Sequence, residues 1–296
     1  MDATAPELVP LNMGGALNQP ALSPDGSRIV VTPLEKRLKA YKLFQELSAR
    51  GTSTREMVCT VSRRSGVSRS AVYTWTKGTS PFGKRCGRVI RTKELFYVIG
   101  ALLGDGCIYR WKNHYQIWLL GEKEFCTKYA KRVSACTSHT TAKPYPYRGR
   151  NVWFVHFQCA ELYFLIKEIR EQLRILTKLL RRGRRSVNAL QLIEGFFDAE
   201  GCVKVIKEKV RRTPKINLDI CNTNRALLLL IGRELKSTLG VEARFTSQWI
   251  SPDRKVSHHL RIYKKSAIRK FLLHVPTIKL KPEKERYVEN WLGKNR

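Results

Sequence analysis

Apolar and polar positions along this chain recur with the periods of helices and strands, except in the first 33 residues. That segment has no sustained period and carries four prolines before Pro33, which predicts a poorly ordered leader over 1–33. From Leu34, apolar residues recur at helical spacing as far as Leu47, and Gly51 follows as a stop signal. The periodic part of the chain therefore begins near residue 34.

A small all-helical domain is predicted over residues 34–80. Ser53 and Glu56 have the spacing of a capping box, and a turn around Gly66 leads into a short helix. Two helices around a glycine-containing turn are typical of a DNA-binding helix-turn-helix. In that interpretation the core contains Val67, Val72 and Trp75, and the groove is faced by Ser68, Arg69, Ser70 and Tyr73. A helical hairpin that only packs is the alternative.

The segment 81–93 is basic and contains glycine, which predicts a linker. The sequence leaves open whether it follows phosphates between two modules or is simply solvated.

Beyond residue 93 the pattern predicts two similar halves, 94–189 and 190–296. Each is expected to follow the order αββαββα, an α+β arrangement with one antiparallel sheet per half. Strands are expected over 107–111, 115–120, 151–158, 202–206, 215–221, 243–249 and 258–263. Further helices are expected over 124–133, 161–180, 224–239 and 265–275.

Two nonamers in these halves are nearly alike. Val98–Gly106 reads VIGALLGDG and Ile193–Gly201 reads IEGFFDAEG. Each is an apolar, helix-length run that ends on one acid followed by glycine, and the two lie about one structural repeat apart. Small residues occupy positions i and i+4 on one face of each helix, and they are Gly100 and Gly104, then Gly195 and Ala199. Such faces let two helix backbones approach closely.

If these two helices pack together, their C-terminal ends bring Asp105 and Glu200 to one place. Two carboxylates about 5 Å apart repel by roughly 3 kcal/mol at an effective dielectric of about 20. Divalent cations relieve that repulsion, and Mg²⁺ suits oxygen ligands and partial hydration. Such ions activate water or stabilise a leaving oxygen in phosphodiester hydrolysis. The alternative for each acid is a helix-terminal carboxylate without a role, although the helix dipole disfavours an acid there.

The charge balance points to a polyanionic partner. Lys and Arg number 56 against 24 Asp and Glu, which gives a formal net charge of +32. Nucleic acid is the expected partner, an anionic membrane surface is the rival, and binding should weaken steeply with salt. No apolar run is long enough for a membrane span, and no secretory signal is visible. The eight cysteines form no CxxC pair, so we expect reduced thiols and a cytoplasmic location, organellar in a eukaryote, without secretion.

The two nonamers resemble the LAGLIDADG, or dodecapeptide (DOD-type), homing endonuclease family. Agreement lies in Gly100 and the Gly104-Asp105-Gly106 ending, and in Gly195 and Asp198–Gly201. The resemblance covers roughly residues 94–296 and implies a monomer whose two sheets form a DNA-binding saddle. It also implies a site-specific, magnesium-dependent endonuclease that makes a staggered double-strand break in duplex DNA, for the mobility of an intron or similar element.

The resemblance further implies residues around the metal site. Asp105 and Glu200 become the metal ligands, Asp198 matches an acid that is mainly structural in the family, and Lys281 matches a lysine that orders solvent. Asn222 matches a Gln or Asn near the site. The first half departs from this pattern, since Leu120 and Gly121 stand where an amide is expected. Unequal cutting of the two strands is therefore expected.

Residues on the strands are expected to contact DNA bases or phosphates. In the first half they are Arg110, Lys112, Gln116 and Trp118, and in the second half they are Lys204, Lys209, Arg211, Lys215 and Asn217. Two other functions remain open at this point. One is a transcription regulator that binds DNA without cutting it, and the other is an RNA maturase that binds intron RNA and assists splicing.

Overall fold

The chain divides into two compact units, which a computed structural model describes. They comprise residues 1–84 and 85–296, so the division lies within the predicted linker. The described residues are 34–79, 81–82, 88–111, 114–138, 142–147, 151–181, 184–206, 214–249 and 256–293. The predicted leader over 1–33 lies outside them. None of the described helices is both long and apolar enough to qualify as a membrane span.

The first unit contains three helices, α1 (Leu34–Ala49), α2 (Thr54–Ser65) and α3 (Arg69–Thr76). The hydroxyls of Ser53 and Ser68 cap α2 and α3, which satisfies backbone N–H groups that a helix leaves unpaired. Gly66 ends α2 with φ +62°, a left-handed conformation that favours glycine. The small core contains Ala40, Phe44, Met57, Val61, Val67, Val72 and Trp75, which includes the three core residues expected from the sequence.

The second unit holds two αββαββα repeats, as the sequence predicts. The first contains α4 (Lys93–Gly104), β1 (Gly106–Trp111), β2 (His114–Gly121), α5 (Lys123–Cys136), β3 (Pro144–Pro146), β4 (Trp153–Gln158) and α6 (Ala160–Glu171). The second contains α8 (Arg185–Glu200), β5 (Gly201–Ile206), β6 (Lys215–Asn222), α9 (Arg225–Leu239), β7 (Arg244–Trp249), β8 (Val256–Ile262) and α10 (Lys265–His274). The antiparallel sheets have the orders β1-β2-β4-β3 and β5-β6-β8-β7. The α+β fold class is confirmed.

Several boundaries differ from the predicted ones. The second repeat begins at Arg185, so the expected division after residue 189 falls inside α8. The helix expected over 161–180 is two helices, α6 and α7 (Arg174–Arg181), because Gln172 takes an extended conformation that neither Gly nor Pro announces. The sequence interpretation also missed β3, which is only three residues long, and α11 (Pro282–Gly293).

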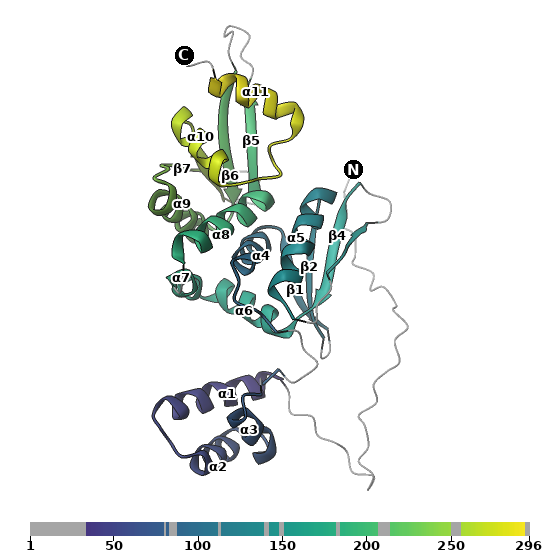
Figure 1. Ribbon diagram of the computed structural model, residues 1–296, viewed down its shortest axis with the longest axis vertical. Helices are drawn as coiled ribbons and strands as arrows, with labels where there is room; N and C mark the ends of the chain where they lie inside the picture. Colours follow the sequence, from purple (N-terminus) through teal and green to yellow (C-terminus); the bar gives the residue numbers. More distant parts are fainter. Residues whose placement is uncertain are drawn as a thin grey trace. The chain divides into compact units, whose positions relative to one another are not determined.

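Helices α4 and α8 lie side by side between the two sheets (Figure 1). Their contact depends on the small residues. A Cβ atom added to Gly100 would overlap the carbonyl oxygen of Leu192, and one added to Gly195 would overlap the carbonyl oxygen of Tyr97. One added to Gly104 would lie 2.6 Å from the Cβ of Ala199. The four small residues therefore occupy the helix contact that the sequence assigns to them.

Candidate active site and nucleic-acid faces

The two acids of the nonamers lie at the adjoining C-terminal ends of α4 and α8. Asp105 directly follows α4 and Glu200 is the last residue of α8. Because Gly104 has no side chain, Glu200 fits beside the end of α4, where an added Cβ on Gly104 would lie 2.9 Å from the Cγ of Glu200. The packed glycine faces thus bring the ends of the two motifs together.

The electrostatics of the two acids agree with this placement. Burial of the Glu200 carboxyl and the nearby charge of Asp105 raise the pKa of Glu200 to about 7. The Asn222 hydrogen bond and the Lys279 charge oppose that shift. Burial of the Asp105 carboxyl by neighbouring atoms also raises its pKa, although part of the residue is exposed to solvent. The Lys279 charge again opposes the shift. The site holds two acids whose negative charges lack full compensation.

Of the two other residues expected at the site, Asn222 contacts Glu200, whereas Lys281 pairs with Glu122. Asn222 donates a hydrogen bond of 2.7 Å from Nδ2 to Oε1 of Glu200. Lys281 instead forms an ion pair with Glu122, with 2.9 Å between Nζ and Oε2. Lys279 is the lysine whose charge acts on both Asp105 and Glu200. The sequence places Lys279 in the same basic segment as Lys281, but it does not show which of the two lysines acts on the acids.

The first repeat lacks a counterpart to Asn222. Gly106 pairs with Leu119 and Gly201 pairs with Ile220, so position 121 corresponds to position 222. Gly121 provides no amide there. On this side Arg170 donates hydrogen bonds of 2.7 Å to the carbonyl oxygens of Leu102 and Gly106, on either side of Asp105. The two halves of the site therefore have different surroundings.

The donor set fits a hard divalent cation. Asp105 and Glu200 provide carboxylate oxygens whose mutual repulsion a cation would relieve. Within the described ranges, no cluster of three or more His, Cys, Asp or Glu side chains could hold a metal ion. The remaining ligands of a cation would therefore have to come from water or from an incoming phosphate, as is usual for Mg²⁺.

Charged and polar side chains cover the open face of the second sheet. Lys204, Lys215 and Asn217 lie on this face, as expected from the sequence, together with Arg261. They line a groove of about 600 Å³ with Ile206, Ile216, Tyr263 and Trp291. Asp219 lies among the cations, with ion pairs to Lys204 and Arg261 and a hydrogen bond of 3.0 Å to Nδ1 of His259. The expected DNA contacts Lys209 and Arg211 lie outside the described residues.

The open face of the first sheet is aromatic. Trp118 stacks on Phe154 with 5.4 Å between ring centroids, and its Nε1 donates to the hydroxyl of Tyr109. Tyr145 and Trp111 are about half exposed at 48% and 55%. Among the described strand residues of this face there is no lysine or arginine. The side chains of Gln116 and His156 are joined by a hydrogen bond.

Of the four nucleic-acid contacts expected in the first repeat, the three that the structure describes do not share one face. Arg110 pairs with Tyr115 and lies over its ring, on the face that the helices cover. Gln116 and Trp118 lie on the opposite, open face, because the register of the hairpin pairs Gln116 with Tyr109. Lys112 lies outside the described residues. Sequence spacing alone cannot fix the register across a turn.

In the first unit, the residues expected to face DNA gather at the start of α3. Ser68 accepts a hydrogen bond from the Ala71 N–H, and Arg69 and Ser70 are exposed. Tyr73 is 49% exposed, with the Lys77 ammonium 5.5 Å from its ring centre. This exposed face is suited to contact DNA, which remains a prediction.

A comparison with protein families finds a match for the second repeat. Residues 188–276 match the family model of the LAGLIDADG-like domain. The chain contains a LAGLIDADG-like domain. The matched residues include the whole second nonamer, which confirms its resemblance to the LAGLIDADG family, and the first nonamer lies outside the match.

Solved structures with related folds include variants of the homing endonuclease I-DmoI, at 19% identity over 62% of this chain and 96% of that chain, with a TM-score of 0.44. I-DmoI in complex with DNA and Ca has 19% identity over 66% and 96%, with a TM-score of 0.45. The N-terminal LAGLIDADG domain of DUF199/WhiA has 12% identity over 67% and 88%, with a TM-score of 0.43. These values are too low to assign an activity. A search of curated proteins finds no match.

Replacing Glu200 with Gln should stabilise the metal-free protein at neutral pH. An acid whose pKa is raised by folding favours its protonated form, so stability falls as pH rises from the unfolded pKa, 4.5, towards about 7. The amide abolishes that loss and can still accept the Asn222 hydrogen bond. We expect a gain of roughly 1–2 kcal/mol at pH 8 in EDTA, and almost none at pH 5, by thermal unfolding. A Glu200→Gln protein that is less stable at pH 8 would contradict the account of this site.

Proposed function

We propose that the chain is a site-specific endonuclease that hydrolyses phosphodiester bonds of double-stranded DNA with divalent cations, in the service of intron mobility. The observation that carries this proposal is the meeting of Asp105 and Glu200 at the ends of two packed helices. A transcription regulator has no need of two closely placed acids, which oppose a DNA phosphate. A nuclease site needs them to hold cations.

Each residue near the two acids would have a different role in the proposed reaction. Asp105 and Glu200 would hold Mg²⁺, which when bound supplies Lewis-acid activation of water and of the phosphate. Asn222 fixes the orientation of the Glu200 carboxylate through its 2.7 Å hydrogen bond. Lys279 brings positive charge to the carboxylates, where it can also attract the scissile phosphate. The +32 charge of the chain draws DNA to the protein.

The unequal surroundings of the two acids support unequal cutting. Glu200 has Asn222 as a hydrogen-bond partner, whereas Gly121 occupies the corresponding position in the first repeat. Arg170 holds backbone carbonyls near Asp105. We therefore expect nicked DNA to accumulate before the double-strand break forms.

The direct test is cleavage of a randomised plasmid library by the full chain in Mg²⁺, with sequencing of the ends. Recurrent, staggered breaks at one sequence would support a site-specific endonuclease, and EDTA should abolish them. Sequence-specific binding without breaks in Mg²⁺ or Mn²⁺ would overturn the proposal in favour of a regulator.

The aromatic face of the first sheet favours a second candidate function, the binding of unpaired bases in RNA. In a duplex the faces of the bases are buried in the stack, whereas unpaired bases stack on aromatic side chains. The rings of Tyr109, Trp111 and Tyr145 are 40%, 55% and 48% exposed on this face, and Trp111 also stacks on His114. A face whose described strand residues include no lysine or arginine, in a chain of charge +32, would contact bases rather than phosphates.

Replacing Trp111 with Ala should weaken binding of a U12 oligonucleotide by about tenfold, since stacking contributes roughly 1–3 kcal/mol per base. Fluorescence anisotropy in 0.3 M salt measures the affinity. Tyr287→Ala is the matched control, because Tyr287 is 40% exposed on helix α11 rather than on a sheet. An equal loss in both variants, or no loss in either, would exclude stacking on this face. A dT12 arm separates RNA from single-stranded DNA.

A further inference from the structure

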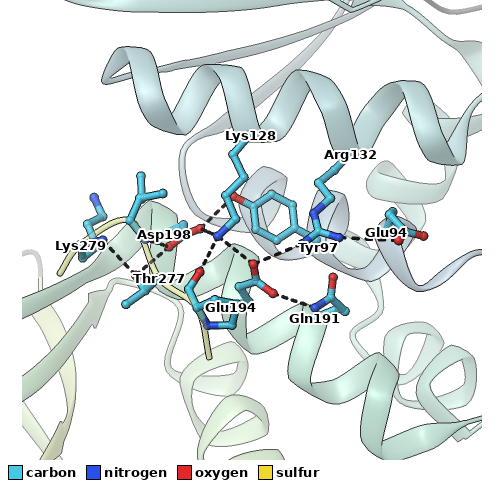
Figure 2. Close-up of polar contacts among 11 residues, drawn as sticks. Glu94, Tyr97, Lys128, Arg132, Gln191, Glu194, Asp198, Thr277 and Lys279 are labelled. Atoms are coloured by element: carbon cyan, nitrogen blue, oxygen red, sulfur yellow. Dashed lines mark hydrogen bonds and ion pairs between the residues drawn. The ribbon is translucent and has the colours of Figure 1, made fainter. Parts of the chain in front are cut away.

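A buried polar network lies beside the contact of α4 and α8 (Figure 2). Asp198 and Glu194 of α8 are only 0% and 1% exposed. Burying two carboxylates is costly unless cations and hydrogen bonds compensate them. Lys128 of α5 compensates both, with 2.7 Å from Nζ to an oxygen of each. Arg132 adds a longer contact of 3.5 Å to Glu194.

Asp198 receives more hydrogen bonds than charge compensation requires. Oδ2 accepts from the Tyr97 hydroxyl at 2.9 Å as well as from Lys128. Burial and the Asp198 charge raise the pKa of Tyr97, so its hydroxyl keeps the proton that it donates. Oδ1 accepts from the Thr277 hydroxyl at 2.7 Å and from the Ile278 N–H at 3.0 Å. One oxygen thus binds the helices and the other binds the segment 276–279.

The hydrogen bonds of Asp198 continue through Thr277 to the backbone of Lys279. The Thr277 hydroxyl that donates to Asp198 also accepts a 3.0 Å hydrogen bond from the Lys279 N–H. Lys128 donates to the Pro276 carbonyl oxygen at 2.6 Å, on one side of Lys279. Lys281 pairs with Glu122 on the other side. Lys279 therefore lies between two anchored points, and its charge acts on the two motif acids.

Only the second repeat has an acid at the position of Asp198, which we call the anchor of the 276–279 segment. Asp198 lies two positions before Glu200, and Leu103 occupies the equivalent position before Asp105. An acid that served only to pack two similar helices would be equally useful in both. Its presence on the side that carries Lys279 connects it with that segment.

We propose that Asp198 is a positioning residue, which with Lys128 and Thr277 holds the 276–279 segment so that Lys279 faces the Asp105–Glu200 pair. The part of this inference that concerns cutting rests on the proposed endonuclease function. The part that concerns the segment itself does not. Because Lys128 belongs to the first repeat, the first repeat thereby sets the geometry of a lysine of the second.

The test removes the hydrogen bonds of the Thr277 hydroxyl and keeps the ion pairs of Lys128. Thr277→Val retains the shape of the side chain but loses both hydroxyl bonds. We expect kcat for a target DNA to fall about tenfold, since small misplacements of catalytic groups are costly. KM, duplex affinity and thermal stability should change little, and Thr277→Ser should restore kcat. The matched control is Thr127→Val, because the Thr127 hydroxyl donates to a backbone carbonyl on the surface of α5.

Hydrogen exchange of the peptide spanning 276–280, measured without DNA or metal, provides a readout independent of cutting. Exchange should be about tenfold faster in Thr277→Val, and faster still in Asp198→Asn, than in the parent and Thr127→Val. Unchanged exchange in Thr277→Val would overturn the anchor. Faster exchange with unchanged kcat would overturn its role for Lys279. If the parent cuts no DNA, the proposed function fails while the exchange result still decides the anchor.

Discussion

Asp105→Asn and Glu200→Gln should each lower the rate of DNA cutting by about a hundredfold to a thousandfold while duplex binding persists. Each change removes one negative charge that a divalent cation needs and leaves the shape of the side chain intact. The measurement is single-turnover cleavage of the selected target in Mg²⁺, alongside the affinity for the same duplex in Ca²⁺.

Glu242→Gln is the matched control for the loss of a carboxylate. Glu242 is 61% exposed on the surface of the second repeat and pairs with Lys236 at 3.0 Å. It should cut at the parent rate. If Asp105→Asn and Glu200→Gln also cut at that rate, the two acids do not form the active site.

Gly195→Ala should destabilise the second unit by about 3 kcal/mol or more. In an exposed helix the same change would stabilise by up to about 1 kcal/mol. Here the new Cβ would overlap the Tyr97 carbonyl, and both α4 and α8 are packed on their other sides, so neither can easily move. Urea unfolding followed by fluorescence measures the change in the free energy of unfolding.

The control for this prediction is Gly293→Ala, because Gly293 ends α11 with nothing within 4 Å of an added Cβ. That variant should be at least as stable as the parent. A Gly195→Ala protein as stable as Gly293→Ala would show that the two helices do not pack through their glycines.

The sequence could predict the helix contact because the information is local and duplicated. Small residues at positions i and i+4 mark one face of a helix, and a second copy of the pattern supplies the partner. Asp105 and Glu200 followed from that contact, since each comes at the end of its helix. Asn222 followed from the family resemblance, which implies a Gln or Asn at the end of that strand, and its contact with Glu200 appears in the structure. The repeat order and the LAGLIDADG-like domain followed from the same duplication.

The sequence could not predict features that depend on register or on contacts between the repeats. Arg110 lies on the covered face because the hairpin pairs it with Tyr115. Lys281 forms its ion pair with Glu122, a residue 159 positions away in the chain, and Lys279 is the lysine whose charge acts on both acids. Asp198 matched an acid with a structural role, and its bonds to Thr277 and Ile278 appear only in three dimensions.

Asp105 and Glu200 should share divalent cations at the adjoining ends of α4 and α8. Anomalous scattering from a crystal of the full chain with duplex target and Mn²⁺ tests it most directly. We expect Mn²⁺ peaks within coordination distance of both carboxylates. Carboxylates that point apart, or Mn²⁺ bound elsewhere in crystals that cut the DNA, would contradict it.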